Sequence, residues 1–258
     1  MLTLTNPVVL DGALAAWYVA IAEFARGQGG IFRTIGNDHF QVVSRALIAD
    51  LNGVFVKGPR SNYDLVAAAA QSQVDFGFPW SIQVRENSPS PQLIDLAAAH
   101  GLSRRTKRPL MIAPVDQPAW PLEQVRDLRL RVANSDDRDA YLAALCSGFS
   151  APPEVMAIFG SVFNLRGATV YVVENSSRVV ATGLVMLVCG WATIYNVATI
   201  PDFRRRGLAT SLLRRILRDA YEAGAHHAVL QSSEAGLRLY EANGFKVAER
   251  WSIFAKDK

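Results

Sequence analysis

Three consecutive arginines stand directly before a glycine in the run Arg204-Arg205-Arg206-Gly207-Leu208-Ala209. The apolar residues that follow Gly207 recur at helical spacing, so a helix is predicted to begin near this glycine. The first N–H groups of a helix have no partner inside it, and small residues let a ligand approach the backbone closely. Guanidinium groups and the helix dipole both attract anions, and bidentate donors suit pyrophosphate oxygens. These residues therefore predict a phosphate-binding turn.

A predicted strand, Trp191 to Ile200, leads into this turn, and Pro201 opens the turn. A strand, a turn and an amphipathic helix thus follow one another without interruption. The order would place the turn at the carboxyl end of the strand, where the helix N-terminus points outward.

Two motifs resemble those of a known family. The spacing R-x-x-G-x-A after a strand ending in V-A-T-I-P resembles the acyl-CoA-binding segment of the GNAT superfamily of N-acetyltransferases. Further along, residues 232–245 resemble the second GNAT signature, a helix ending in L-Y-x-x-x-G-F. The two motifs stand in the order and at the separation that the family requires.

The resemblance implies acetyl-CoA as co-substrate, an amine acceptor and no metal. Main-chain groups of Val197, Ala198 and Thr199 would bind the pantetheine arm along an unpaired strand edge. Ser233 stands where the family often has Asn and would also contact acetyl-CoA. The pyrophosphate would lie on the segment made of Arg204, Arg205, Arg206, Gly207, Leu208, Ala209 and Thr210.

The implied reaction is direct attack of a neutral amine on the acetyl thioester, with one group taking the amine proton and another protonating the leaving thiolate. Tyr240 matches the family's acid; the alternative is a core aromatic whose hydroxyl bonds only to the backbone. The base is open, because the strand from Trp191 to Ile200 contains no carboxylate. Candidates are Glu234, Glu174, Tyr195 or a chain of waters.

The chain has 258 residues, which exceeds one such domain and favours two. Residues 113–123 hold three prolines and mark a linker. We therefore predict a degenerate GNAT-like domain over residues 1–122 and a catalytic GNAT domain over residues 123–258. The predicted fold class is α/β (α+β), each domain being a mixed, mostly antiparallel sheet flanked by helices.

The first half is predicted to contain a helix, three strands, a helix, a strand, a helix and two strands. The helices are 10–26, 64–74 and 91–100; the strands are 31–35, 39–45, 53–57, 80–85, 102–106 and 109–112. A similar order in the second half indicates a tandem repeat. In the first copy, Lys57 to Asp64 lacks R-x-x-G-x-A and Ala97 stands where Tyr240 does, so no CoA is expected there. The alternative is an unrelated α/β domain.

The second half is predicted to begin with a strand over Val125–Ala133, followed by two helices. Strands at 169–174, 179–189 and 191–200 precede the helix that follows the arginines. The last predicted elements are a strand at 225–231, a helix at 236–242 and strands at 246–250 and 251–255.

Composition and charge exclude several classes of protein. The net charge of +4 lies wholly in the second half, around the arginines, which fits a compact polyanion better than a nucleic-acid surface. The basic residues Arg104, Arg105, Lys107 and Arg108 leave a nucleic-acid partner as an alternative. Cys146 and Cys189 and the four histidines have no metal-like spacing and suggest no disulfide framework. No uninterrupted apolar run approaches the roughly 18 residues needed to cross a membrane, and no basic region followed by an apolar block is evident at the start, so we expect a cytoplasmic protein without membrane contact.

The leading hypothesis is an acetyl-CoA-dependent N-acetyltransferase that acts on a primary amine of a small molecule, peptide or protein. The missing strand carboxylate leaves a non-catalytic acyl-CoA sensor as a second hypothesis. A third is an aminoacyl-tRNA-linked transferase, since other tandem GNAT proteins handle charged tRNA. The acceptor is not readable from the sequence. The chain is expected to be a monomer or a homodimer.

Overall fold

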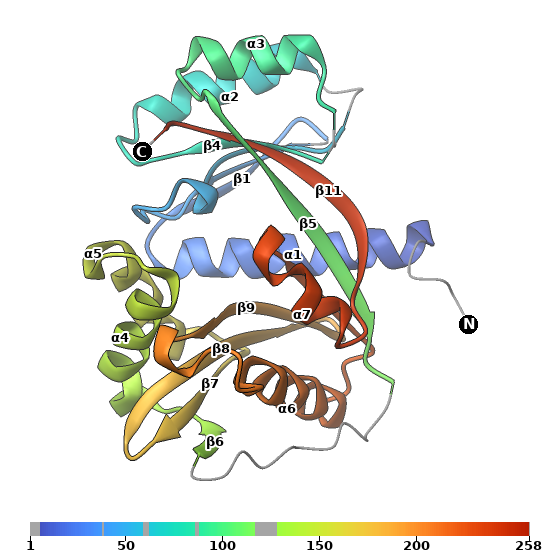
Figure 1. Cartoon of the computed structure of the whole chain (residues 1–258). Helices are drawn as coiled ribbons and strands as arrows, with labels where there is room; N and C mark the ends of the chain where they lie inside the picture. The colour runs from blue at the N-terminus through green and yellow to red at the C-terminus, as the bar shows by residue number, and fades with distance from the viewer. Residues whose placement is uncertain (1–5, 38, 59–61, 86–87, 117–127, 258) are drawn as a thin grey trace. The chain divides into compact units, whose positions relative to one another are not determined.

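The computed structural model describes residues 6–37, 39–58, 62–85, 88–116 and 128–257. The helices are α1 (Pro7–Gly27), α2 (Tyr63–Val74), α3 (Pro91–Ala99), α4 (Arg138–Phe149), α5 (Pro153–Met156), α6 (Leu208–Glu222) and α7 (Leu237–Glu241). The strands are β1 (Ile31–Ile35), β2 (His39–Val43), β3 (Asn52–Val56), β4 (Ser81–Val84), β5 (Arg104–Pro114), β6 (Leu128–Val132), β7 (Ala168–Asn175), β8 (Arg178–Val188), β9 (Trp191–Thr199), β10 (His227–Gln231) and β11 (Lys246–Ala255) (Figure 1).

The chain forms two compact units. The β9 unit comprises residues 1–20, 111–231 and 236–246, and the β3 unit comprises residues 21–110, 232–235 and 247–258. Strand order is β5-β10-β9-β8-β7-β6 in the β9 unit and β1-β2-β3-β4-β11-β5 in the β3 unit. Residues of β5 therefore belong to both.

The units do not follow the predicted division between residues 122 and 123, a boundary that itself lies outside the described residues. The physical reason is strand pairing across the sequence. Ser252–Ala255 of β11 pair antiparallel with Ser81–Val84 of β4, so the last strand joins the β3 unit. In turn β5, which follows α3 in the chain, lies beside β10. Each unit thus includes part of the last strand of the other half of the sequence, residues 111–114 of β5 in the β9 unit and residues 247–255 of β11 in the β3 unit.

Most predicted elements are present, with two exceptions. The pieces predicted at 102–106 and 109–112 form the single strand β5, and those predicted at 246–250 and 251–255 form the single strand β11. Both predictions divided a strand at polar residues. Pairing with neighbouring strands keeps the backbone extended through such positions, because β propensity depends on context. Of the strand predicted at 125–133, residues 125–127 lie outside the described part.

Helices cover both faces of the sheet in the β9 unit. Leu212 and Ile216 of α6 lie so close to Gly183 of β8 that a side chain at this glycine would overlap them. The preceding residue, Thr182, points to the opposite face and pairs with Ala198, which lies against Gly148 of α4. The fold is therefore the predicted mixed, mostly antiparallel α/β arrangement, with parallel pairing at β3·β4 and β9·β10.

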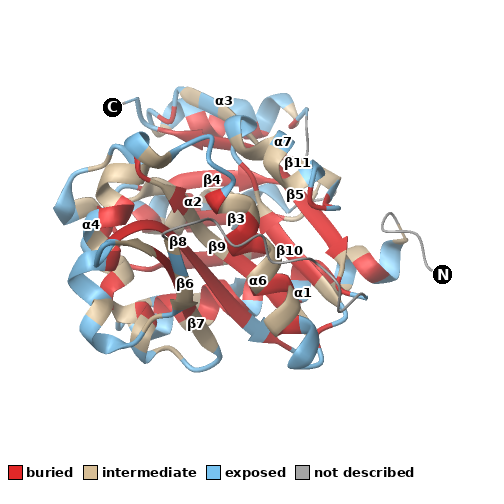
Figure 2. Cartoon of the chain, turned by 60° about the horizontal axis from the view of Figure 1, so that its bottom comes forward, coloured by how far each residue is buried: buried red, intermediate tan, exposed pale blue. Residues whose placement is uncertain are grey.

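Burial follows the same layers. Strand residues are mostly buried, and each covering helix has a buried and an exposed face (Figure 2). Helix α6 shows the pattern most clearly: its inner face is formed by Leu208, Ser211, Leu212, Leu213, Ile216, Leu217 and Ala220. This amphipathic packing fixes α6 on the sheet, and with it the turn that precedes the helix.

Helix α1 is long and apolar enough to cross a membrane when judged by length and composition alone. In the structure, however, 61% of its most apolar window is buried inside the protein. Such burial is typical of a core helix. The helical segments 135–149 and 153–164 are long and apolar enough for a membrane span only if they are counted together. They are bent relative to each other by 117°.

Candidate active site at the end of strand β9

Strands β9 and β10 separate soon after they begin. Their parallel pairing covers three residue pairs, from His227 opposite Trp191 to Val229 opposite Thr193. From Ile194 to Thr199, β9 has no strand partner on the side away from β8 among the described residues. An unpaired edge presents main-chain donors and acceptors to a ligand. The predicted pantetheine-binding residues Val197, Ala198 and Thr199 all lie on this stretch.

A β-bulge in β9 lies within the open stretch. Leu184 of β8 is opposite Tyr195, whereas Thr182 is opposite Ala198, so two residues of β9 face one residue of β8. One of these two, Asn196, has a left-handed backbone with φ of +54°. Such bulges turn main-chain groups away from the ladder and occur next to active sites.

Neighbouring side chains hold the bulge. The Asn196 amide nitrogen donates to the buried hydroxyl of Tyr141 at 2.8 Å, and the Thr182 hydroxyl donates to the Asn196 carbonyl at 2.9 Å. Burial raises the pKa of Tyr141 well above its ordinary value, so its hydroxyl stays protonated. Sequence reasoning missed Asn196 and Tyr141. The available signal was an asparagine inside a strand, because asparagine is depleted in strands and tolerates a left-handed backbone.

The start of α6 has the properties of an anion site. Gly207 is its N-cap, with φ of +77°, and no side chain caps the helix. The first helical bond runs from the N–H of Ser211 to the Gly207 carbonyl. In the described structure the N–H groups of Leu208, Ala209 and Thr210 have no partner, and the first turn contains no acid. This arrangement fits a phosphate or pyrophosphate group.

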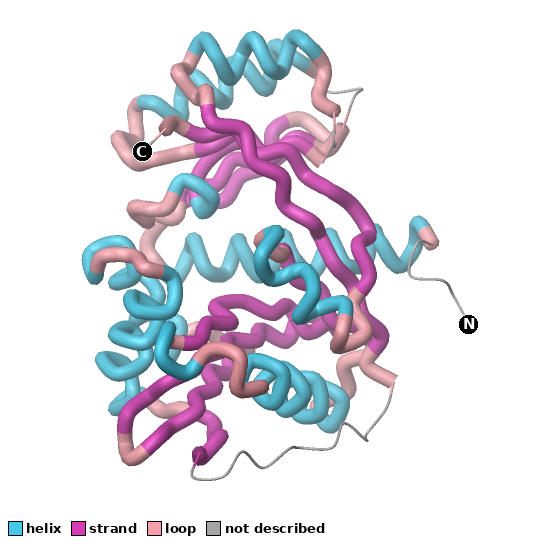
Figure 3. Tube along the Cα trace, viewed as in Figure 1, coloured by secondary structure: helices cyan, strands magenta, loops and turns pink. Residues whose placement is uncertain are grey.

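Space and backbone conformation at the turn support the same conclusion. A side-chain carbon at Gly207 would meet no atom within 4 Å, so the turn is open on this side. Arg205 is also left-handed, with φ of +62°, which is uncommon for a residue other than glycine. Figure 3 traces the chain from β9 through this turn into α6.

The three arginines differ in their contacts. Arg204 donates to the Thr199 carbonyl at 3.1 Å and to the Gly148 carbonyl at 2.8 Å, and so ties the end of β9 to α4. Arg206 donates to the Asp202 carbonyl at 2.8 Å and lies over the ring of Phe203. Arg205 has no partner among the described residues. Two of the three guanidinium groups thus brace the turn.

Tyr240 lies near the end of α7 and is half-buried. Its ring meets that of Phe245 edge to face, with centroids 5.8 Å apart. Its carbonyl accepts hydrogen bonds from the N–H groups of Asn243 and Phe245. Burial raises the pKa of the Tyr240 hydroxyl to about 12. The phenol therefore carries its proton at neutral pH, as a general acid must.

The base candidates are engaged elsewhere. Glu174 pairs with Arg131 of β6, and Glu234 pairs with Arg250 at 3.2 Å. Tyr195 packs against a cluster that includes Ala16 and Ala20 of α1. Burial raises the pKa of its hydroxyl well above the ordinary value, although a hydrogen bond with Thr193 acts in the opposite direction. Ser233, the last predicted contact of acetyl-CoA, is exposed and belongs to the β3 unit. Its position relative to the open strand stays a prediction.

In the described ranges, no group of three or more His, Cys, Asp or Glu side chains lies close enough together to hold a metal ion. Strand β9 and the start of α6 offer open main-chain groups and a helix N-terminus, and α7 carries a protonated phenol. Groups of these kinds can bind an acyl thioester that carries a pyrophosphate, and can supply a proton to a leaving thiolate.

Comparisons with known proteins find one family match within the chain. Residues 166–247 match the model of the acetyltransferase (GNAT) domain, a range that includes β9, the turn, α6 and Tyr240. A glucosamine 6-phosphate N-acetyltransferase from Trypanosoma brucei brucei is 25% identical over 141 residues, or 50% of this chain and 96% of that protein. A ribosomal protein bS18-alanine N-acetyltransferase from Salmonella typhimurium is 35% identical over 74 residues, or 28% of this chain. This match spans half the length of the Salmonella protein.

Solved structures match nearly the whole chain. A GCN5-related N-acetyltransferase from Kribbella flavida has a TM-score of 0.66 at 16% identity and covers 93% of this chain and 95% of its own. Another from Sphaerobacter thermophilus has a TM-score of 0.64 at 21% identity and covers 97% and 93%. At these identities the likeness shows the fold alone.

Proposed function

Because residues 166–247 carry a GNAT acetyltransferase domain, we propose that this acyltransferase moves an acetyl group from acetyl-CoA to a primary amine. The observation that carries the proposal is the uncapped start of α6 directly after an unpaired stretch of β9. Open main-chain groups suit the amide-rich pantetheine arm, and free helix N–H groups suit the pyrophosphate.

In the proposed reaction the neutral amine attacks the thioester carbonyl. A carbon–nitrogen bond forms, the carbon–sulfur bond breaks, and the amine loses a proton. The thiolate of CoA leaves and takes a proton from Tyr240, whose raised pKa keeps it protonated beforehand. A water chain to solvent is the proposed route for the amine proton, since Glu174 and Glu234 are held in ion pairs.

The proposed acceptor is a small molecule, a peptide or a protein with a primary amine. Two relatives are named for different amines, an amino-sugar phosphate and an alanine of a ribosomal protein. The shared chemistry of these names is attack by an amine. Accordingly the proposal commits to an amine and not to a particular acceptor.

The proposal also includes a tandem arrangement, with the β3 unit as a degenerate copy that does not bind CoA. The order of three antiparallel strands, helix, parallel strand, helix and last strand occurs in both halves of the chain, which supports the repeat. We further propose a cytoplasmic protein that is a monomer or a homodimer.

The test is release of free CoA thiol from acetyl-CoA in the presence of fractionated amine metabolites and peptides. We expect release that depends on one fraction and falls about 100-fold in kcat for Tyr240→Phe, because the leaving thiolate loses its proton donor. Binding of acetyl-CoA should be unchanged in this variant, which separates chemistry from affinity.

A second candidate function is a non-catalytic acyl-CoA sensor. The observation in its favour is that both candidate carboxylates, Glu174 and Glu234, are paired with arginines. Tight acetyl-CoA binding with no thiol release from any fraction would support the sensor and refute the transferase. Tight binding of an aminoacyl-tRNA would instead favour the third, tRNA-linked function.

A further inference from the structure

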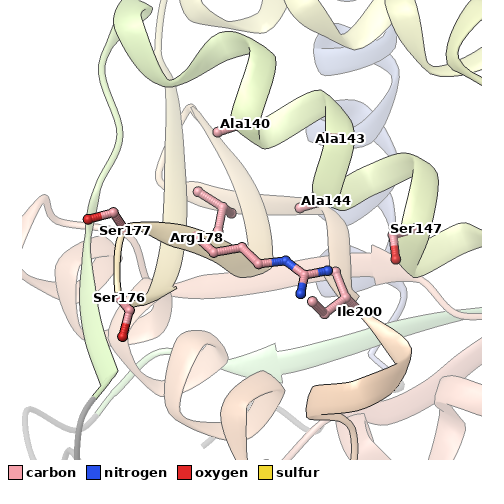
Figure 4. Close-up of a pocket in the computed structure, with 9 residues that line it drawn as sticks. Ala140, Ala143, Ala144, Ser147, Ser176, Ser177, Arg178 and Ile200 are labelled. Atoms are coloured by element: carbon pink, nitrogen blue, oxygen red, sulfur yellow. The ribbon is translucent and has the colours of Figure 1, made fainter.

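A pocket of about 440 Å³ lies within the β9 unit, between α4 and the hairpin turn that joins β7 to β8 (Figure 4). Its volume falls within the range of roughly 300–1,000 Å³ that small-molecule sites occupy. The lining residues are Ala140, Ala143, Ala144, Ser147, Ser176, Ser177, Arg178, Val179 and Ile200. None of them was singled out as a site residue from the sequence.

Arg178 supplies the charge of this pocket. Its side chain runs from the hairpin beneath α4 toward Ile200 (Figure 4). Within the described residues its guanidinium makes neither an ion pair nor a hydrogen bond. Five donors in a planar fork are thus available to an anion, and this geometry matches a carboxylate or a phosphate.

The walls divide into polar and apolar parts. Ser147, Ser176 and Ser177 are the polar uncharged residues of the lining, and the residues other than these and Arg178 are aliphatic. The hydroxyls of Ser176 and Ser177 point away from the Arg178 guanidinium, whereas Ser147 lies on the side toward which this guanidinium extends (Figure 4). Ser176 and Ser177 are left-handed, with φ of +45° and +70°, at turn positions usually taken by asparagine and glycine. Serine at such positions is strained, and strain of this kind often accompanies function.

The pocket is separate from the proposed acetyl-CoA site. It adjoins the start of β8, whereas the open edge of β9 faces away from β8. The two are linked through Arg204, whose acceptors Gly148 and Thr199 directly neighbour the lining residues Ser147 and Ile200. A ligand here would lie beside the phosphate-binding turn without occupying it.

We propose that this pocket binds a small organic anion, with one carboxylate or phosphate group on Arg178, on the side of the pocket where Ser147 lies. The aliphatic walls take a short apolar body attached to that group. A single cation matches a single anionic group, and the remaining volume is too apolar for a second charge.

Calorimetric titration of the full-length protein with phenyl phosphate and phenylacetate tests the proposal and distinguishes phosphate from carboxylate. We expect saturable binding of at least one probe that persists in the presence of saturating CoA. Arg178→Gln should weaken this binding by about tenfold or more, because it removes a charged donor pair. The matched control is Arg129→Gln, another exposed arginine of the β9 unit that does not line the pocket, which should bind like the parent protein.

A second variant, Ala143→Leu, fills the pocket from an exposed position on α4 and should abolish binding without unfolding the protein. Thermal unfolding of each variant verifies its fold. The proposal is overturned if neither probe saturates, if Arg178→Gln binds as tightly as the parent, or if saturating CoA displaces the probe.

Discussion

The two units contain matching parallel strand pairs that differ in how far they stay paired. In the β3 unit, β3 and β4 pair through all four residues of β4, from Ser81 to Val84. The backbone N–H of Arg85 extends this ladder by donating to the Val56 carbonyl at 3.1 Å. In the β9 unit, β9 and β10 pair over three residues. For its next six residues β9 pairs only with β8 among the described strands. The first pair leaves no edge for a ligand, and the second does.

The helices that follow β3 and β9 also differ in whether their first N–H groups are capped. Helix α2 starts with Asn62, whose side chain accepts from the N–H of Leu65 at 3.4 Å, and it has Asp64 in its first turn. Helix α6 starts with Gly207 and has neither a side-chain cap nor an acid. A helix whose first N–H groups are capped, and whose first turn carries an acid, does not attract an anion. A helix with uncapped N–H groups and no acid does attract one. In the β3 unit a side chain satisfies the helix start, whereas in the β9 unit the N–H groups at the helix start have no side-chain cap.

The largest expected effect comes from giving α6 an acid like that of α2. Gly207→Asp should weaken acetyl-CoA binding by about 100-fold, because a carboxylate would stand where the pyrophosphate is attracted. Gly207→Asn is the matched control, since it has the same shape and tolerates a left-handed backbone without the charge. Equal dissociation constants for the two variants, measured by calorimetry, would show that the charge at this turn has no role.

Acid pH weakens the β9 unit through Asp137, which precedes α4. Hydrogen bonds from Arg131 lower the pKa of Asp137 from 3.8 to about 2. A lowered folded-state pKa contributes stability above pH 4 that is lost as the pH falls through about 2, an effect of about 2 kcal/mol. Urea unfolding between pH 5 and pH 2 measures it. If the pH dependence is the same in Asp137→Asn, the ion pair does not contribute.

The bulge in β9 can be tested through the backbone of Asn196. Asn196→Ala should lower kcat/KM for acetyl-CoA by roughly tenfold, because a left-handed alanine costs roughly 1–2 kcal/mol. Asn196→Gly loses the same hydrogen bond to Tyr141 but adopts this backbone freely, and should retain most of the activity. Similar losses in both variants would assign the effect to the lost hydrogen bond and not to the bulge conformation.

The smallest effect is expected at the capped helix of the β3 unit. Asn62→Ala should lower the free energy of unfolding by about 1 kcal/mol, the usual value of an N-cap. It should leave the dissociation constant of acetyl-CoA unchanged, since this unit is proposed not to bind CoA. Weaker acetyl-CoA binding in the variant would contradict that assignment.

Much of the β9 unit was predictable because its signals are local. Gly207 follows a strand and precedes an apolar stripe of helical period, so the turn could be placed from the sequence alone. The opening of the strand pair was expected only from the family resemblance. The residues themselves do not specify it, because it depends on where β10 departs from β9. Nor did the sequence predict that the Arg204 side chain would donate to the carbonyls of Thr199 and Gly148. Gly148 lies on α4, which is far from Arg204 in the sequence.

The division into compact units could not be predicted for a related reason. A proline-rich stretch indicated a linker, and a linker usually separates units that are each complete. The pairing of β11 with β4 is a contact between residues far apart in sequence, and nothing in Ser252 to Ala255 specifies which strand they join. Alternation of buried and exposed residues predicts that a strand exists but not its neighbour.

The exchange of last strands bears on how the chain can be divided. A fragment that starts at residue 123 would lack Met111–Pro114, the strand segment beside β10, while keeping a β11 whose partner β4 had been removed. Both pieces would expose sheet edges, and such edges promote aggregation. Cutting within residues 117–127 should thus give two fragments that are soluble only when expressed together.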